Sequence, residues 1–322
     1  MTTDSPVTIA HDVLQLGPVQ VSFQRTLRLP ETGLHALPPG LGRFRLRRVA
    51  DYPDTAPADW LERGGVMLPV YQREAMWLSF VSSEPAALQV AIGKICAISG
   101  TAWREKLRHE PQNYVALPRQ PWLDGINSGD GTIRQFVAVA LGSGATVEGQ
   151  LSGEEIHGGI QLRAVGLSDA ALQSWRAEQH RASGRRMSAV AAAPASAAMG
   201  LGAGGRMRQE IYADQRQLAD YDEDRSWRVF VHLCSAEQWT TITGELPPPT
   251  PIDRETYVKF GLPWFDYYDA DADDLAASQA LAQVKTVDEV LGLPVEPFSP
   301  VDPATVIQLK DAHGDEVSDG DW

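Results

Sequence analysis

Cysteine is scarce in this chain of 322 residues, which contains only two. Two thiols can form neither a disulfide framework nor a zinc site with four cysteine ligands. The sequence also lacks a strongly apolar run of about 18 residues, and Met1–Ala10 shows no basic region followed by an apolar segment. These absences lead us to expect a soluble cytoplasmic protein in which Cys96 and Cys234 are reduced, buried and unreactive.

Basic residues are also in deficit, with 28 Lys and Arg against 42 Asp and Glu and a net charge of −14. Most of the excess lies in Pro263–Trp322, which holds 14 acidic and two basic residues. The main basic stretch, from Arg176 to Arg208, has only Trp175 as an aromatic neighbour. Because phosphate contact requires clustered Lys and Arg, we expect neither nucleic acid nor a membrane as partner.

Alternation of apolar and polar residues predicts strands along much of the chain. From Val19 to Leu29 nearly every odd position is apolar and every even position is polar, the pattern of a half-buried strand. Further strands are predicted over Tyr114–Leu117, Thr132–Leu141, Val147–Leu151, Ile160–Val165 and Trp227–Cys234. The residues of Gly125–Gly131 predict a hairpin turn. We therefore expect an α+β protein: a β-rich sandwich or barrel-like body with a few peripheral helices.

Capping residues mark the predicted helices. Ser168 precedes a helix predicted over Asp169–Arg181, and capping boxes at Ser235 and Thr286 begin two shorter helices. Two more helices are predicted over 253–260 and 271–284.

Composition divides the chain into four parts. Ala, Ser and Gly dominate residues 183–205 and offer few side chains for packing, so a flexible loop is predicted there. The other three parts are a β-rich body over 1–182, a strand–helix part over 206–293 that packs on the body, and an acidic, Pro-rich tail over 294–322.

Three motifs resemble nucleotide or metal sites but lack required features. Gly200–Gly205 matches G-x-G-x-x-G, yet Ala, Ser and Pro precede it in place of a hydrophobic strand. Asp269–Asp273 resembles the start of a calcium loop without its Gly and Glu. The Glu-x-x-His spacing of Glu154 and His157 lies between glycines, hence in a turn, and the other histidines add no ligand spacing. We expect no cofactor and no metal.

Histidine and carboxylates leave a catalytic hypothesis open. His157 is a candidate general acid or base, with Glu154, Asp124 and Arg134 as candidate companions. If these four side chains converge in one concave pocket, a cofactor-independent hydrolase or isomerase becomes the better interpretation. His232 and Cys234 share a strand face with Phe230, which favours packing over a thiolate–imidazole pair.

Two segments rich in aromatic residues favour binding instead. Pro118–Gly125 places Trp122 beside prolines and a carboxylate, and Gly261–Asp269 gathers four aromatic residues and two carboxylates. Such rings either cover the edge of a sheet, which we expect of Trp264, or form a recognition surface. The candidate binding residues are Trp122, Trp264, Phe265, Asp266 and Tyr267.

The leading hypothesis is a non-catalytic cytoplasmic binding or assembly protein, with a protein or a small molecule as its unidentified partner. Together with Gly131–Ala138, the two aromatic segments resemble those of a family of uncharacterised bacterial proteins, over about Val19–Tyr268. No activity is known for that family. The resemblance therefore implies only that these segments recur together.

Overall fold

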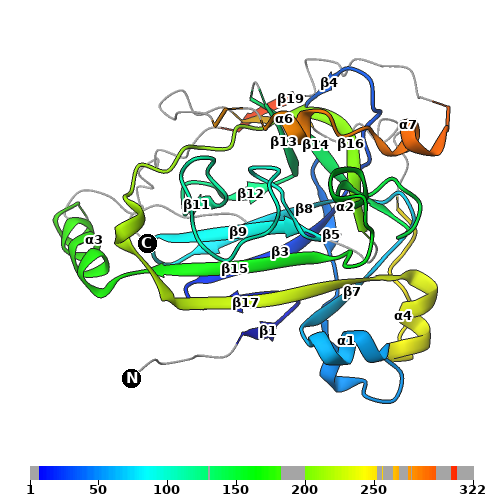
Figure 1. Ribbon diagram of the computed structural model, residues 1–322, viewed down its shortest axis with the longest axis horizontal. Coiled ribbons are helices and arrows are strands. Elements are labelled where there is room, and N and C mark those ends of the chain that lie inside the picture. The colour runs from blue at the N-terminus through cyan, green and yellow to red at the C-terminus, as the bar shows by residue number, and fades with distance from the viewer. Residues whose placement is uncertain are drawn as a thin grey trace, which may run out of the picture.

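Two mixed β-sheets, one of ten strands and one of seven, form the body of the computed structural model (Figure 1). This arrangement confirms the predicted β-rich α+β fold. The structure describes residues 7–129, 131–182, 200–251, 256, 264–267, 275–276, 278–294 and 306–309.

The ten-stranded sheet is built mainly from the N-terminal half of the chain. Its central path is β1 (Thr8–Ala10), β2 (Val13–Leu16), β3 (Val19–Thr26), β8 (Ala75–Ser82), β14 (Thr132–Val139), β16 (Gly200–Arg208) and β4 (Leu34–His35). Three further strands pair beside this path: β5 (Gly40–Arg43) with β3, β12 (Trp122–Leu123) with β8, and β13 (Gly125–Gly129) with β14.

The seven-stranded sheet brings distant parts of the chain together. Its order is β10 (Ile95–Cys96), β9 (Ala86–Ile92), β15 (Ile160–Leu167), β17 (Tyr221–Ser235), β7 (Val66–Val70) and β6 (Arg47–Arg48), with β11 (Val115–Leu117) also pairing β9. The long strand β17 pairs antiparallel with β15 and parallel with β7.

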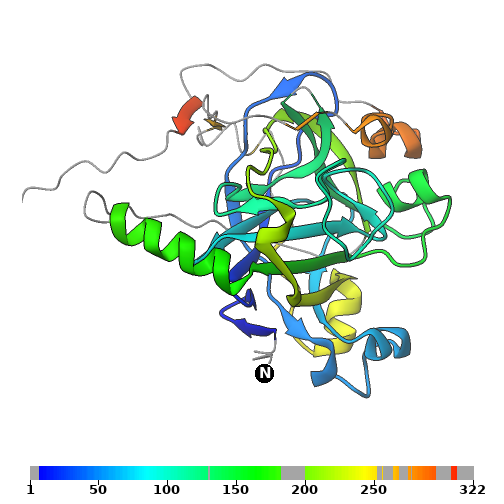
Figure 2. The ribbon, with the colours of Figure 1, turned by 60° about the vertical axis from the view of Figure 1, so that its left-hand side comes forward.

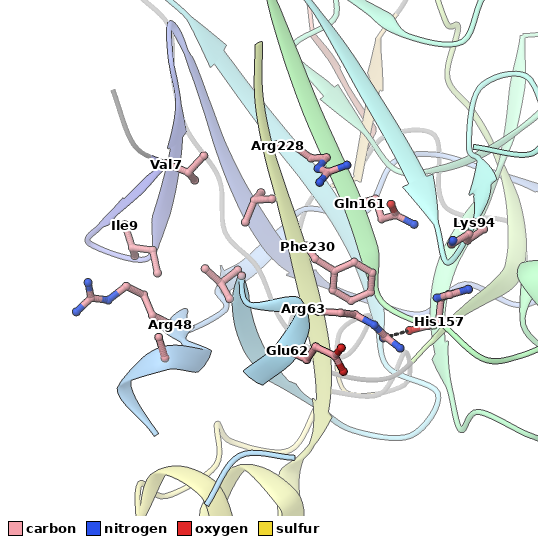
Figure 3. A pocket seen from close by; sticks show the side chains of 14 residues that line it. Val7, Ile9, Arg48, Glu62, Arg63, Lys94, His157, Gln161, Arg228 and Phe230 are labelled. Carbon is pink, nitrogen blue, oxygen red and sulfur yellow. Dashed lines mark hydrogen bonds between the residues drawn. The ribbon is translucent and has the colours of Figure 1, made fainter. Parts of the chain in front are cut away.

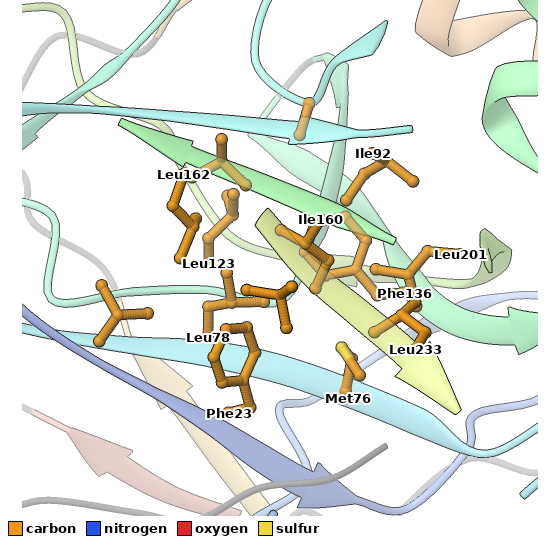
Figure 4. Packing of buried hydrophobic residues seen from close by; sticks show 14 of the residues in the cluster. Phe23, Met76, Leu78, Ile92, Leu123, Phe136, Ile160, Leu162, Leu201 and Leu233 are labelled. Carbon is orange, nitrogen blue, oxygen red and sulfur yellow. The ribbon is translucent and has the colours of Figure 1, made fainter. Parts of the chain in front are cut away.

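The main core lies between the two sheets (Figure 4). Phe23 and Leu78 occupy opposite positions on β3 and β8, and both are fully buried. They face Ile160 and Leu162 of the other sheet (Figure 4). Full burial of one such side chain stabilises the fold by about 1.5–3 kcal/mol, so the alternating pattern of β3 determines which face is inside.

The helices lie at the periphery, and α3 projects from one end of the sheets (Figure 2). The helices whose bounds the structure describes are α1 (Ala58–Arg63), α2 (Val147–Ser152), α3 (Asp169–Ala182), α4 (Ala236–Thr243), α6 (Gln279–Ala282) and α7 (Val287–Leu291), with 3-10 turns η1 (Val49–Asp51) and η2 (Leu218–Asp220). The predicted caps are confirmed: the hydroxyls of Ser235 and Thr286 accept the N–H groups of Gln238 and Glu289.

Two local predictions are wrong. The strand predicted over Val147–Leu151 is helix α2, because the Thr146 hydroxyl accepts the N–H of Gly149 and so caps a helix. The turn predicted over Gly125–Gly131 is mostly strand β13, which pairs antiparallel with β14. The first correction comes from a local cap at Thr146, and the second from pairing with β14.

The predicted division of the chain also needs correction. The last six residues of the predicted loop, 200–205, begin β16, whereas 183–199 lie outside the described residues. The part over 206–293 supplies β17, which pairs with β15 and β7 and so lies within the seven-stranded sheet. Within the predicted tail, β19 (Val306–Leu309) pairs parallel with β18 (Trp264–Tyr267).

Two predicted helices fall largely outside the described residues. Of 253–260, only Thr256 is described, and it is helical. In the described part of 271–284 the helix is α6 alone, and the Asp269–Asp273 motif lies outside the described residues.

Candidate ligand-binding cleft

A cleft of about 690 Å³ lies beside β17, with β1 and α1 at its border (Figure 3). Four cationic side chains line it: Arg48, Arg63, Lys94 and Arg228. The acidic residue among the lining residues is Glu62. The chain as a whole carries a net charge of −14, so this basic lining runs against the charge of the protein.

The four cations differ in how far they are already neutralised. Arg48 pairs with Asp51 at 2.8 Å, and Arg228 pairs with Glu105. Arg63 lies 3.9 Å from the Asp59 carboxylate, at the limit of an ion pair. Lys94 has no ion-pair partner among the described residues.

Buried Glu148 holds the inner wall of the cleft together. Its carboxylate accepts the backbone N–H groups of Lys94 at 3.1 Å, His157 at 3.3 Å and Gly158 at 2.9 Å. The close approach of the Glu148 carboxylate to the Gly93 backbone requires glycine at this position, where φ is +56° and a Cβ would lie 2.4 Å from the carboxylate. Glu148 therefore fixes two turns, and with them Lys94 and His157, beside one another.

His157 is half-buried at the junction of these turns, and its backbone oxygen accepts the Arg63 Nη1–H at 3.4 Å (Figure 3). Burial and the Lys94 ammonium lower the pKa of its imidazole below the ordinary value. The ring is therefore neutral at pH 7. A neutral imidazole can donate one hydrogen bond and accept another, so it can contact a ligand without adding charge.

Aromatic rings form the wall beneath Arg63. The Phe230 ring lies 5.5 Å below the Arg63 guanidinium, and His232 lies between Phe230 and Trp60, with its ring centroid 4.6 Å from each. Burial lowers the pKa of His232 to about 4, and its Nε2 lies 2.9 Å from the Gly64 carbonyl oxygen. His232 is thus a neutral packing residue that supports the cleft.

Burial also determines the protonation state of Cys234. Its side chain is fully buried, and burial raises the pKa of its thiol to about 12. No thiolate is available there at neutral pH, which agrees with the packing role expected for the His232–Cys234 strand.

The four candidate catalytic residues do not converge, since only His157 lines the cleft. Glu154 is exposed. Arg134 reaches the backbone carbonyls of Ala282 and Val284, beside α6. Asp124 is buried in the ten-stranded sheet.

Asp124 belongs to a closed polar cluster. Its carboxylate accepts hydrogen bonds from the Gln209 amide at 2.7 Å and from the Trp122 indole. Burial raises the pKa of Asp124 to about 7. The Asp124 carboxylate thus finds its hydrogen-bond partners within the protein, so a structural role accounts for the cluster.

The predicted binding residues lie elsewhere in the molecule. Trp264 is 2% exposed and packs against the main core, as expected for a covering residue, so its ring is not available to a partner. Trp122 is half-buried beside Asp124. Phe265, Asp266 and Tyr267 follow Trp264 in β18, and their side chains lie outside the described residues.

Most of the cleft was missed by sequence reasoning. Arg48, Arg63, Lys94 and Arg228 come from β6, α1, the β9–β10 turn and β17, which are far apart in the chain. The one local signal was Gly93 next to Lys94, which marks a turn between two apolar segments.

In the described part of the chain, no cluster of three or more His, Cys, Asp or Glu side chains could hold a metal ion. Among those same residues, no helix combines the length and apolar character needed to cross a membrane. No family model, curated protein or solved structure matches the chain.

Proposed function

We propose that this protein is a non-catalytic binding protein that holds an anionic ligand in the cleft. The observation that carries the proposal is that Arg63, Lys94 and Arg228 lie on the same side of β17 as the neutral imidazole of His157 (Figure 3), with Lys94 lacking an ion-pair partner among the described residues. An anion placed between Lys94 and Arg63 would receive charge-assisted hydrogen bonds from both side chains. Gln161 and His157 offer neutral donors beside them.

The catalytic alternative lacks the arrangement that it required. A hydrolase or isomerase of the expected type needs Glu154, Asp124 and Arg134 beside His157, and the cleft contains His157 alone of these. The binding proposal uses the same imidazole as a hydrogen-bonding group, so it needs no companion carboxylate.

The proposal is tested by titrating the protein with tripolyphosphate and with hexaglutamate at low ionic strength, using calorimetry. Lys94→Gln and Arg63→Gln should each weaken binding by about 5- to 10-fold, close to 1 kcal/mol for a partly exposed charge. Arg176→Gln is the matched control, because Arg176 lies on α3 outside the cleft and pairs with Glu84. Equal binding by all variants, or no binding of either anion, would contradict the proposal.

A further inference from the structure

One edge of β17 borders the cleft, and no strand of the described chain pairs with it there. The strand pairs with β15 from Tyr221 to Val231, whereas its pairing with β7 begins only at Val231. Among the described residues, the stretch from Tyr221 to Phe230 has no strand on that second side. An open edge presents unpaired N–H and C=O groups to any extended chain that reaches it.

The backbone geometry shows which groups point outward. The Phe230 carbonyl oxygen faces β7, where a Cβ on Gly65 would lie only 2.2 Å away, whereas the Val231 oxygen faces Gly159 before β15. Successive residues of a strand alternate in this direction. Ser226 and Arg228 therefore point their N–H and C=O groups to the open edge, in step with Phe230.

The cleft follows this edge and provides it with two kinds of surface. Val7 and Ile9 extend from the β1 segment toward β17 and form an apolar side of the cleft (Figure 3). Val229 of β17 also lines the cleft. Arg228 and Phe230 project from the opposite face of β17, on the side of Arg63 and Lys94, whereas Arg48 lies beside Ile9 (Figure 3). Arg63, Lys94 and Arg228 are called the basic rim. An added strand whose side chains alternate would therefore place apolar residues on one side and acidic residues on the other.

We propose that the cleft binds an acidic, extended segment of a partner protein, which adds a strand to β17 beside Ser226–Arg228. The proposal rests on the anion-binding function proposed above and names the class of ligand. Main-chain hydrogen bonds hold the segment, and the basic rim selects acidic side chains.

Charge also limits where the segment can lie. Asp222, Glu223 and Asp224 occupy the first half of β17, and the Asp222 carboxylate already accepts the Asp224 N–H at 3.1 Å. An acidic strand is repelled there and is attracted by Arg63, Lys94 and Arg228 at the other half. This distribution favours an acidic peptide over a basic or neutral one.

The first experiment separates main-chain recognition from attraction of charge alone. A blocked hexapeptide of alternating Glu and Val is titrated beside two derivatives, each N-methylated on one of the two alternating sets of amides. The three peptides carry the same charge, but each derivative lacks the N–H donors along one edge of the peptide strand. We expect at least one derivative to bind about tenfold or more weakly than the parent.

The second experiment alters the protein edge. Ser226→Pro removes an N–H that points to the open edge and keeps the N–H groups that β17 donates to β15. Ser226→Ala is the matched control for loss of the hydroxyl. We expect Ser226→Ala to bind the hexapeptide as the native protein does and Ser226→Pro to bind it about tenfold or more weakly. If Ser226→Pro fails to fold, the methylated peptides still decide the matter.

The outcomes are distinct. Equal binding of the parent and both derivatives would overturn strand addition and leave anion binding in place, as would binding of tripolyphosphate without the hexapeptide. Binding of neither anion would overturn both proposals. A dimer of this chain that the hexapeptide does not dissociate, and that Ser226→Pro abolishes, would show that a second copy occupies the edge and would also overturn the inference.

Discussion

The Glu148 carboxylate accepts the backbone N–H of Lys94 at 3.1 Å, although the two residues are 54 positions apart in the chain. The same carboxylate accepts the N–H groups of His157 and Gly158, so one buried charge connects two turns of the seven-stranded sheet. Lys94 itself is exposed, which leaves its ammonium free to face the cleft. Glu148 is thus a positioning residue for the basic rim.

Glu148→Gln should lower the free energy of unfolding by about 2–3 kcal/mol, because the amide places an N–H₂ group where a carboxylate oxygen accepted a buried N–H. Urea unfolding measures the change. Glu154→Gln is the control, since Glu154 is exposed in the neighbouring turn and its loss should change stability by less than about 0.5 kcal/mol. Equal effects of the two substitutions would contradict the role of Glu148.

Trp264→Ala should lower the free energy of unfolding by about 3–5 kcal/mol, because the indole is buried and its removal leaves a cavity. Trp122→Ala should cost less through packing, since Trp122 is only half-buried. The urea midpoint and the tryptophan emission are the measurements. An unchanged midpoint with loss of a red, solvent-like emission component in Trp264→Ala would refute the burial of this ring.

Truncation after Leu293 should lower the free energy of unfolding by about 1–2 kcal/mol. It removes β19, whose Val306 is half-buried opposite Trp264, and full burial of a valine contributes about 1.5–3 kcal/mol. Truncation after Leu309 keeps β19 and is the matched control. The prediction fails if both truncated chains unfold at the same urea concentration.

Asp124 should make the native protein less stable as the pH rises. Its pKa is about 7 in the folded state and near 3.9 in an unfolded chain, so the folded state binds more protons between these values. The stabilising effect of its proton is complete below about pH 4 and is lost as the pH rises through 7, at ~1.4 kcal/mol for each pKa unit. Asp124→Asn removes this dependence. Urea unfolding of both proteins across this range should show the native protein losing stability relative to the variant, whereas parallel profiles would contradict the prediction.

Local chemistry in the sequence determined much of the secondary structure. The alternation in Val19–Leu29 predicted β3, and the capping hydroxyls at Ser235 and Thr286 predicted α4 and α7, because these signals act between residues only a few positions apart. The burial of Trp264 and Cys234 was also expected from the sequence. The β-rich α+β class followed from the same short-range patterns.

Only the tertiary structure decided the positions of the strands and the site. β13 and β16 form because each pairs with β14. Neither has an alternation of apolar residues strong enough to predict a strand. The cleft joins Arg48, Arg63, Lys94 and Arg228 from four separate elements, and its inner wall depends on the bond from Lys94 to Glu148. Such contacts depend on how strands pair across the chain, and a single sequence carries no local signal for which distant segments will lie side by side.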